Sequence, residues 1–241
     1  MKHFILLVLA ACTVSAQDVG VDYLSWDGRL VYDINSIKSE GLKDVSRFMS
    51  DAASTVYVTL PTALYAYGVL GSEFGTPSAE KRYAAETGLQ AATALGITYG
   101  IAVATKIVVD RARPYQAYPG LIVNGEGNND KYLSSFPSGH SAGAAALATT
   151  MILRYPDKWY VIAPSIGYSL WMGFSRMNLG VHYTTDVLAG YAIGAGIAYG
   201  VHAISKHVFD VAEPLLPADG SVAVGLSGTP TTPIFMLSMN F

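Results

Sequence analysis

Residues 132–153 read YLSSFPSGHSAGAAALATTMIL, and His140 is the only residue in this stretch that can carry charge near neutral pH. Most of the other positions hold Ala, Gly, Ser or Thr, which let two helix backbones approach closely. The stretch is long enough to cross a hydrocarbon core or to form a fully buried helix. It therefore predicts a helix that packs tightly inside a bundle.

Four further runs share this composition, and charged residues make up only 14% of the chain, whereas about 25% is usual. The runs are Ala52 to Ser72, Thr87 to Thr105, Trp159 to Ser175, and Val187 to Ser205. Together the five runs predict an all-α fold, a helical bundle of five to six helices. We expect it to be membrane-embedded, since Tyr residues lie near the ends of the runs as in an interfacial belt. A soluble bundle with an apolar interior is the alternative.

The N-terminal segment has the pattern of a secretory signal peptide over residues 1–16. Lys2 precedes a short apolar stretch, and the segment ends at Ala16 in small residues typical of a cleavage site. An alternative is a lipoprotein signal in which Cys12 is acylated; in both cases the chain leaves the cytoplasm. Cys12 is the only cysteine, so no intramolecular disulfide and no Cys-based metal site can form.

The predicted organisation places a short leader at 17–28, a helical domain at 29–208 and a tail at 209–241. Residues 30–50 carry apolar side chains at near-helical spacing, which predicts an amphipathic helix with a break near Gly41. In the tail, two segments of alternating apolar residues flank a stretch with Gly and Pro. This pattern predicts a small β-hairpin.

Three polar clusters lie beside the apolar runs. The first joins Lys106 to Arg113 and Pro114, where the proline favours a helix end. The second is Pro137-Ser138-Gly139-His140, whose amides and hydroxyl at a helix start favour anion binding.

The third cluster contains Ser175-Arg176, His182 and Asp186. His182 and Asp186 are four residues apart, so on a helix they share a face. The carboxylate can then bond one imidazole nitrogen and leave the other free to attack.

Antiparallel helices would bring all three clusters to the same end of the bundle. One run ends near Lys106, the next starts near Ser138, another ends near Arg176 and the last starts near His182. Each cluster alone has an ordinary explanation, such as a helix cap or a surface pair. Three cations, two imidazoles and a helix N-terminus in one place favour a phosphoryl group.

The three clusters together resemble the signature of the type 2 phosphatidic acid phosphatase and vanadium haloperoxidase superfamily, from Lys106 to Asp186. The resemblance implies His182 as the nucleophile, Asp186 as its orienting carboxylate and His140 as the acid and base. It also implies that phosphate is bound by a set of donors from all three clusters, namely Lys106, Arg113, Ser138, Gly139 and Arg176. No cofactor and no metal are implied.

The expected function is that of a metal-independent phosphatase that acts through a phosphohistidine intermediate. We expect lipid phosphates such as phosphatidic acid or polyprenyl phosphates as substrates, at a periplasm-facing site in a bacterial envelope membrane. The alternatives are a soluble secreted acid phosphatase that acts on small phosphomonoesters, and a vanadium-dependent haloperoxidase. With a net charge of -3 and no basic stripe, no nucleic-acid partner is expected.

Overall fold

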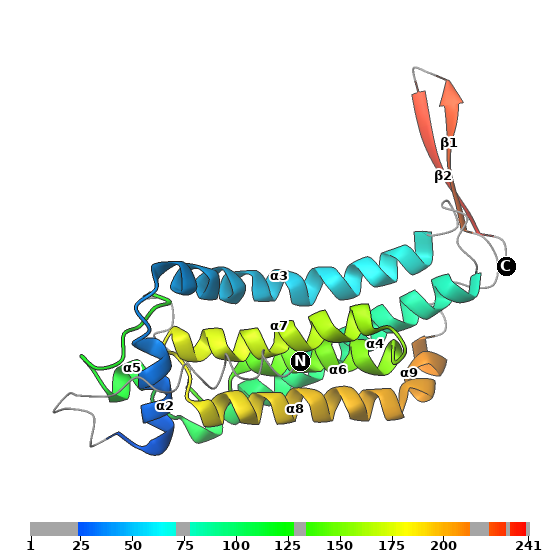
Figure 1. Cartoon of the computed structure of the whole chain (residues 1–241). Helices are drawn as coiled ribbons and strands as arrows, with labels where there is room; N and C mark the ends of the chain where they lie inside the picture. The colour runs from blue at the N-terminus through cyan, green and yellow to red at the C-terminus, as the bar shows by residue number, and fades with distance from the viewer. Residues whose placement is uncertain (1–23, 71–77, 128–133, 213–221, 230–231, 240–241) are drawn as a thin grey trace.

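The computed structural model describes residues 24–70, 78–127, 134–212, 222–229 and 232–239. Its long helices run side by side, with the short α2 and α5 at one end and a hairpin at the other (Figure 1). The predicted signal peptide, including Cys12, lies outside the described residues. The helices are α2 (Trp26–Asn35), α3 (Glu40–Leu70), α4 (Ser78–Val109), α5 (Pro114–Ala117), α6 (Gly139–Arg154), α7 (Trp159–Asn178), α8 (Thr184–Ala203) and α9 (Ser205–Ala212).

The predicted helical bundle is confirmed, and α6 lies at its centre. Ten of the sixteen residues of α6 are buried, most of them Ala, Gly or Ser. On the facing helix α8, a Cβ added to Gly190 would lie 2.6 Å from the carbonyl oxygen of Ser138. A Cβ on Gly194 would overlap the backbone of Ala142. These glycines let the two backbones touch, and this contact sets the start of α8 beside the start of α6.

The N-terminal region differs from the prediction in where its helix breaks. The break follows Asn35 and spans residues 36–39, and α3 then continues without interruption from Glu40 to Leu70. The helix break therefore lies a few residues before the predicted position near Gly41. It lies there because the Asn35 side chain turns inward instead of continuing the amphipathic pattern. Its amide donates to the carbonyl oxygens of Val123 and Asn178, at 3.0 and 2.9 Å.

The segment assigned to the leader contributes to the folded region. Ser25 caps α2 by accepting a hydrogen bond from the Gly28 amide at 3.1 Å. The helix begins at Trp26, and Asp27 and Gly28 are buried. The helical region thus starts before residue 29.

The tail contains the β-hairpin that alternation predicted. Strands β1 (Val222–Thr229) and β2 (Thr232–Met239) pair antiparallel, with Leu226 opposite Phe235. Helix α9 precedes them and extends to Ala212, so the first residues of the predicted tail are helical.

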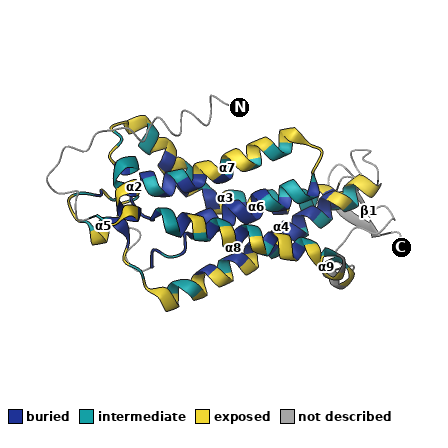
Figure 2. Ribbon diagram, turned by 60° about the horizontal axis from the view of Figure 1, so that its bottom comes forward, coloured by how far each residue is buried: buried dark blue, intermediate teal, exposed yellow. Residues whose placement is uncertain are grey.

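Among the described helices, the stretch Ala79–Ala117 is the one with enough length and apolar character to span a membrane. Sequence patterning gave five such runs, but α6 has only 16 residues, and Gly, Ser, Thr and Tyr lower the hydropathy of α3, α7 and α8. Their outer faces nevertheless carry large apolar side chains. Figure 2 shows exposed residues along α7, α8 and α4. They include Ile101, Val108, Ile166, Leu170, Trp171, Leu188 and Tyr199.

Candidate active site

The three predicted clusters meet at the end of the bundle that carries α2 and α5 (Figure 1). The Lys106 ammonium donates to the carbonyl oxygen of Ser134, just before α6. The Ser138 amide donates to the Asp186 carbonyl at 3.0 Å, and a guanidinium nitrogen of Arg113 donates to the Val181 carbonyl at 3.0 Å. The antiparallel arrangement expected from the sequence therefore holds for the segments that carry the clusters.

His182 and Asp186 are close, but not for the reason that their spacing suggested. Helix α8 begins at Thr184, so His182 lies in the preceding turn, not on a helical face. Asp186 bends back toward that turn, and its Oδ2 accepts from the Tyr183 amide at 2.8 Å. The Nδ1 of His182 lies 3.5 Å from this Oδ2 and forms no hydrogen bond. Contacts of this kind in ligand-free enzymes often tighten when substrate binds.

The turn before His182 depends on Gly180, which has a φ of +71°. A Cβ at this position would lie 2.5 Å from the Val123 carbonyl oxygen and 2.9 Å from the side-chain amide nitrogen of Asn35. Both the left-handed backbone and the lack of space therefore require glycine. This turn, two residues before His182, packs against the loop that contains Val123.

The surroundings of His182 keep its imidazole neutral. The side chain is buried, with 2% of its surface exposed. Burial is the largest cause that lowers its pKa well below the ordinary value, and the charges of Arg176, Arg113 and Lys106 lower it further. A neutral imidazole has the lone pair that nucleophilic attack requires.

Arg176 is bound by the carboxylate of Glu126, in the segment between α5 and α6. Its Nη2 donates to Glu126 Oε2 at 2.8 Å, and its Nη1 donates to Glu126 Oε1 and to Ser50. The Ser50 hydroxyl in turn donates to Glu126 Oε1 at 2.6 Å. The Arg176 and Glu126 side chains are 2% and 15% exposed, so this ion pair is largely removed from water.

Ser138 caps the N-terminus of α6. Ser138 Oγ accepts from the Ser141 amide at 3.3 Å and lies 2.8 Å from the Ser141 hydroxyl. The next residues, Gly139 and His140, form the first turn of the helix. The carbonyl of His140 accepts from the Tyr57 hydroxyl at 2.7 Å, which ties this turn to α3.

Sequence reasoning missed a second set of polar residues around Asp186. Arg111 Nη1 donates to Asp186 Oδ1 at 2.6 Å, and the Ser135 hydroxyl donates to Oδ2. Arg111 also donates through Nη2 to Asp27 Oδ2 at 2.9 Å. Arg111 lies inside the Lys106-to-Arg113 segment and was available as a candidate. Asp27 lies far away in the sequence, in a segment without a recognisable motif.

Comparison with known proteins finds relatives in sequence and in fold. A curated relative, the lipid A 1-phosphatase of Rhizobium johnstonii, is 35% identical over 91 residues, which cover 37% of this chain and 36% of the relative. The match thus spans about a third of that relative's length.

Two solved structures share the fold. The crystal structure of Aquifex aeolicus LpxE superposes with a TM-score of 0.60 at 19% identity, covering 76% of this chain and 98% of that one. A transmembrane PAP2-type phosphatidylglycerolphosphate phosphatase from Bacillus subtilis gives a TM-score of 0.58 at 20% identity, covering 86% and 96%.

The family assignment follows from the polar clusters and the bundle taken together. The family model described as PAP2 superfamily matches residues 87–210, which is just over half of the chain and contains all three clusters. The resemblance inferred from the sequence is thereby confirmed, and this chain belongs to the PAP2 superfamily.

Proposed function

We propose that this chain hydrolyses lipid phosphate monoesters, with His182 as the nucleophile and without a metal ion. The observation that carries the proposal is a buried imidazole with a lowered pKa, surrounded by Arg176, Arg113 and Lys106. Such a site attracts an anion, offers it a neutral nucleophile and stabilises the charge of the transition state in a dry environment.

In the first step, the Nε2 lone pair of His182 attacks phosphorus in line with the leaving oxygen. Nε2 is the attacking atom because Nδ1 faces Asp186. The bond between phosphorus and the leaving oxygen breaks, and its electron pair stays on that oxygen. His140, which takes up a proton once the negative charge of the phosphate is bound beside it, donates that proton there, so the lipid leaves as an alcohol.

In the second step, neutral His140 removes a proton from a water molecule whose oxygen attacks phosphorus. The bond between phosphorus and Nε2 breaks, neutral His182 is restored and inorganic phosphate leaves. Throughout, the cationic side chains, the Ser138 hydroxyl and the Gly139 amide bind the phosphate oxygens. Asp186 orients His182 and stabilises its positive charge in the intermediate.

A lipid substrate is supported by the apolar outer surface of the bundle. Large apolar side chains are exposed on α4, α7 and α8, which suits contact with hydrocarbon more than with water (Figure 2). The names of two similar proteins also support a lipid substrate, since one acts on lipid A and the other on phosphatidylglycerol phosphate. We therefore propose that the protein lies in a membrane of the bacterial envelope, and the predicted signal peptide favours an active site at its periplasmic face.

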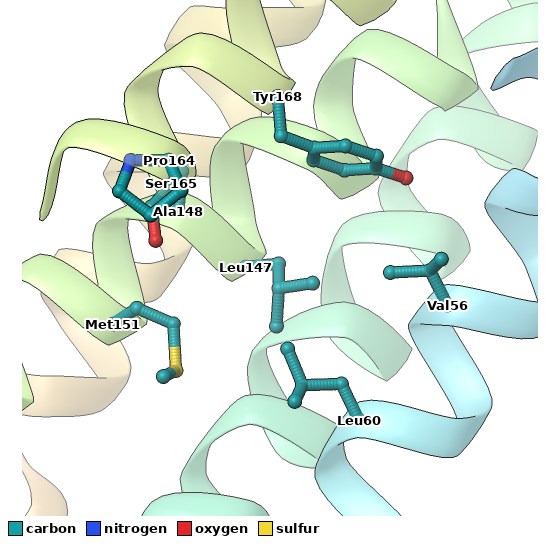
Figure 3. Close-up of a pocket in the computed structure, with 8 residues that line it drawn as sticks. All are labelled: Val56, Leu60, Leu147, Ala148, Met151, Pro164, Ser165 and Tyr168. Carbon is teal, nitrogen blue, oxygen red and sulfur yellow. The ribbon is translucent and has the colours of Figure 1, made fainter. Parts of the chain in front are cut away.

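A pocket of about 180 Å³ between α3, α6 and α7 also suits an apolar ligand. Figure 3 shows the side chains that face into it, among them Leu60, Leu147, Met151 and Tyr168. The Tyr168 ring packs edge-on against Tyr57, 6.4 Å between centroids, and Tyr57 in turn holds the first turn of α6. The pocket is thus connected to the start of α6 through Tyr168 and Tyr57, and part of a hydrocarbon chain can bind in it.

The test is phosphate release from phosphatidic acid by purified protein in detergent with EDTA. Wild type and a His202→Ala control should release phosphate, because His202 pairs with Gln90 away from the site, at 3.0 Å. His182→Ala should be inactive, and acid-sensitive phosphoprotein should be trapped in wild type and in the His202→Ala control but not in His182→Ala. Full activity in His182→Ala, or complete loss with EDTA, would exclude the mechanism. Release of the protein from membranes by carbonate would exclude membrane embedding.

A further inference from the structure

A network of charged side chains connects the α2 helix to the Asp186 carboxylate. Asp27 is buried, with 4% of its surface exposed. Its Oδ1 accepts from the Thr185 amide at 3.0 Å, and its Oδ2 accepts from Arg111 Nη2 at 2.9 Å and from the Thr185 hydroxyl. Asp27 therefore contacts the first turn of α8 directly and also through Arg111.

Arg111 bridges the two carboxylates. Its Nη1 donates to Asp186 Oδ1 at 2.6 Å and to the Thr185 hydroxyl at 2.7 Å. The guanidinium carbon lies 3.7 Å from the centre of the Tyr183 ring, so the group is also held by a cation–π contact. Charge-assisted hydrogen bonds on both edges of the guanidinium leave it little freedom to rotate.

The backbone around Arg111 supports the same geometry. Asp110 has a positive φ of 41°, which ends α4 and turns the chain. The Arg111 amide then donates to the Ser134 hydroxyl at 2.8 Å, and its carbonyl accepts from the Ser135 amide at 2.7 Å. Ser135 itself donates to Asp186 Oδ2, so the two segments joined by these hydrogen bonds together contact both oxygens of that carboxylate.

We propose that Arg111 and Asp27 are positioning residues that hold Asp186 for its interaction with His182. Arg111 occupies Oδ1, while Oδ2, which accepts from Ser135 and the Tyr183 amide, is the oxygen that faces the imidazole. Asp27 fixes Arg111 and adds a negative charge, so Arg111 does not neutralise Asp186 completely. Asp27 lies outside residues 87–210, so the site extends beyond the part that matches the family model.

The direction in which the pKa of Arg111 is shifted agrees with this geometry. Burial by itself lowers the pKa of Arg111, yet its hydrogen bonds and charge interactions with Asp27 and Asp186 raise that pKa above the ordinary value. The inference rests on the proposed nucleophilic role of His182. The charged and titratable groups near His182 are Asp186, Arg176, Arg113, Lys106 and His140, and Arg111 reaches it through its contact with Asp186.

The experiment compares kcat, KM and the pH profile of Arg111→Gln, Arg111→Lys, Asp27→Asn and the double variant on a soluble phosphomonoester. We expect kcat to fall about 10- to 100-fold with little change in KM, because a misplacement near 1 Å can cost about 100-fold. Arg111→Gln should shift the acid limb of kcat/KM to higher pH, since Asp186 then stabilises protonated His182 more strongly. Asp27→Asn should shift it to lower pH.

Arg111→Lys should retain the acid limb of wild type while kcat stays low, because one ammonium keeps the charge but cannot bridge both carboxylates. The double variant should be no worse than the more damaging single variant, since both changes disrupt one unit. Arg82→Gln is the matched control: Arg82 pairs with Glu86 at the other end of α4, and its side chain is 32% exposed against 30% for Arg111. The kcat, KM and pH profile of this control should match those of wild type.

Binding of inorganic phosphate, measured by calorimetry, reports whether each variant is folded with an intact anion site. Variants that bind phosphate like wild type and keep its kcat and pH profile would overturn the inference. So would additive losses in the double variant, or variants that lose phosphate binding altogether. His182→Ala, assayed in parallel, separates the two proposals. If it stays active, the proposed function fails; if it is inactive while the Arg111 and Asp27 variants are normal, only the positioning role fails.

Discussion

Glu126 occupies the guanidinium of Arg176, the group that we propose for binding the substrate phosphate. The carboxylate accepts hydrogen bonds from Nη1 and Nη2, so an incoming phosphate must displace it from at least one of them. Glu126→Gln keeps the shape and one acceptor but removes the competing charge. We expect this variant to bind inorganic phosphate more tightly than wild type.

The size of the effect follows from the burial of the pair. Because the two side chains are only 2% and 15% exposed, solvent screens their interaction weakly. A hydrogen bond to a charged group contributes about 1.5–3 kcal/mol, and each 1.4 kcal/mol is about tenfold in affinity. The inhibition constant for inorganic phosphate should therefore fall by roughly 10- to 100-fold in Glu126→Gln. KM for a soluble phosphomonoester should fall with it.

The assay is phosphate inhibition of phosphomonoester hydrolysis, together with thermal unfolding with and without phosphate. Glu86→Gln is a matched control, because Glu86 pairs with Arg154 at 3.2 Å with similar exposures of 17% and 8%. Both variants should be destabilised without ligand, but phosphate should restore only Glu126→Gln. Weaker phosphate binding in Glu126→Gln would refute the reasoning and make Glu126 a support for Arg176.

Three further outcomes are expected. The free energy of unfolding should decrease as the pH falls below about 6.5, the ordinary pKa of His. The unfolded chain then binds a proton at His182 that the folded chain does not, and His182→Phe should show a smaller decrease in the same titration. Gly180→Ala should lower the unfolding temperature and kcat together, because the turn before His182 has no space for a Cβ; an unchanged kcat would contradict this. Ser165→Phe, which fills the pocket beside α6, should reduce hydrolysis of long-chain phosphatidic acid more than that of a soluble phosphomonoester, and equal reductions would argue against a chain-binding pocket.

Much of the fold could be predicted because helix formation and burial depend on local composition. The apolar runs with few charges correspond to α3, α4, α6, α7 and α8. Helix ends were less accurate where a side chain contact decided them. The break after Asn35 depends on its hydrogen bonds to Val123 and Asn178, which are far away in the sequence.

The sequence by itself determined the candidate reacting groups, the order of the three clusters and the helical scaffold that brings them together. Spacing and residue type were sufficient there, because antiparallel helices place their alternate ends side by side. Only the tertiary structure decided what surrounds those groups. It placed His182 in a turn instead of on a helix, set Glu126 against Arg176, and joined Asp27 to Asp186 through Arg111. Glu126 and Asp27 come from segments without a motif, and long-range contacts between buried charges leave no periodic pattern in the sequence.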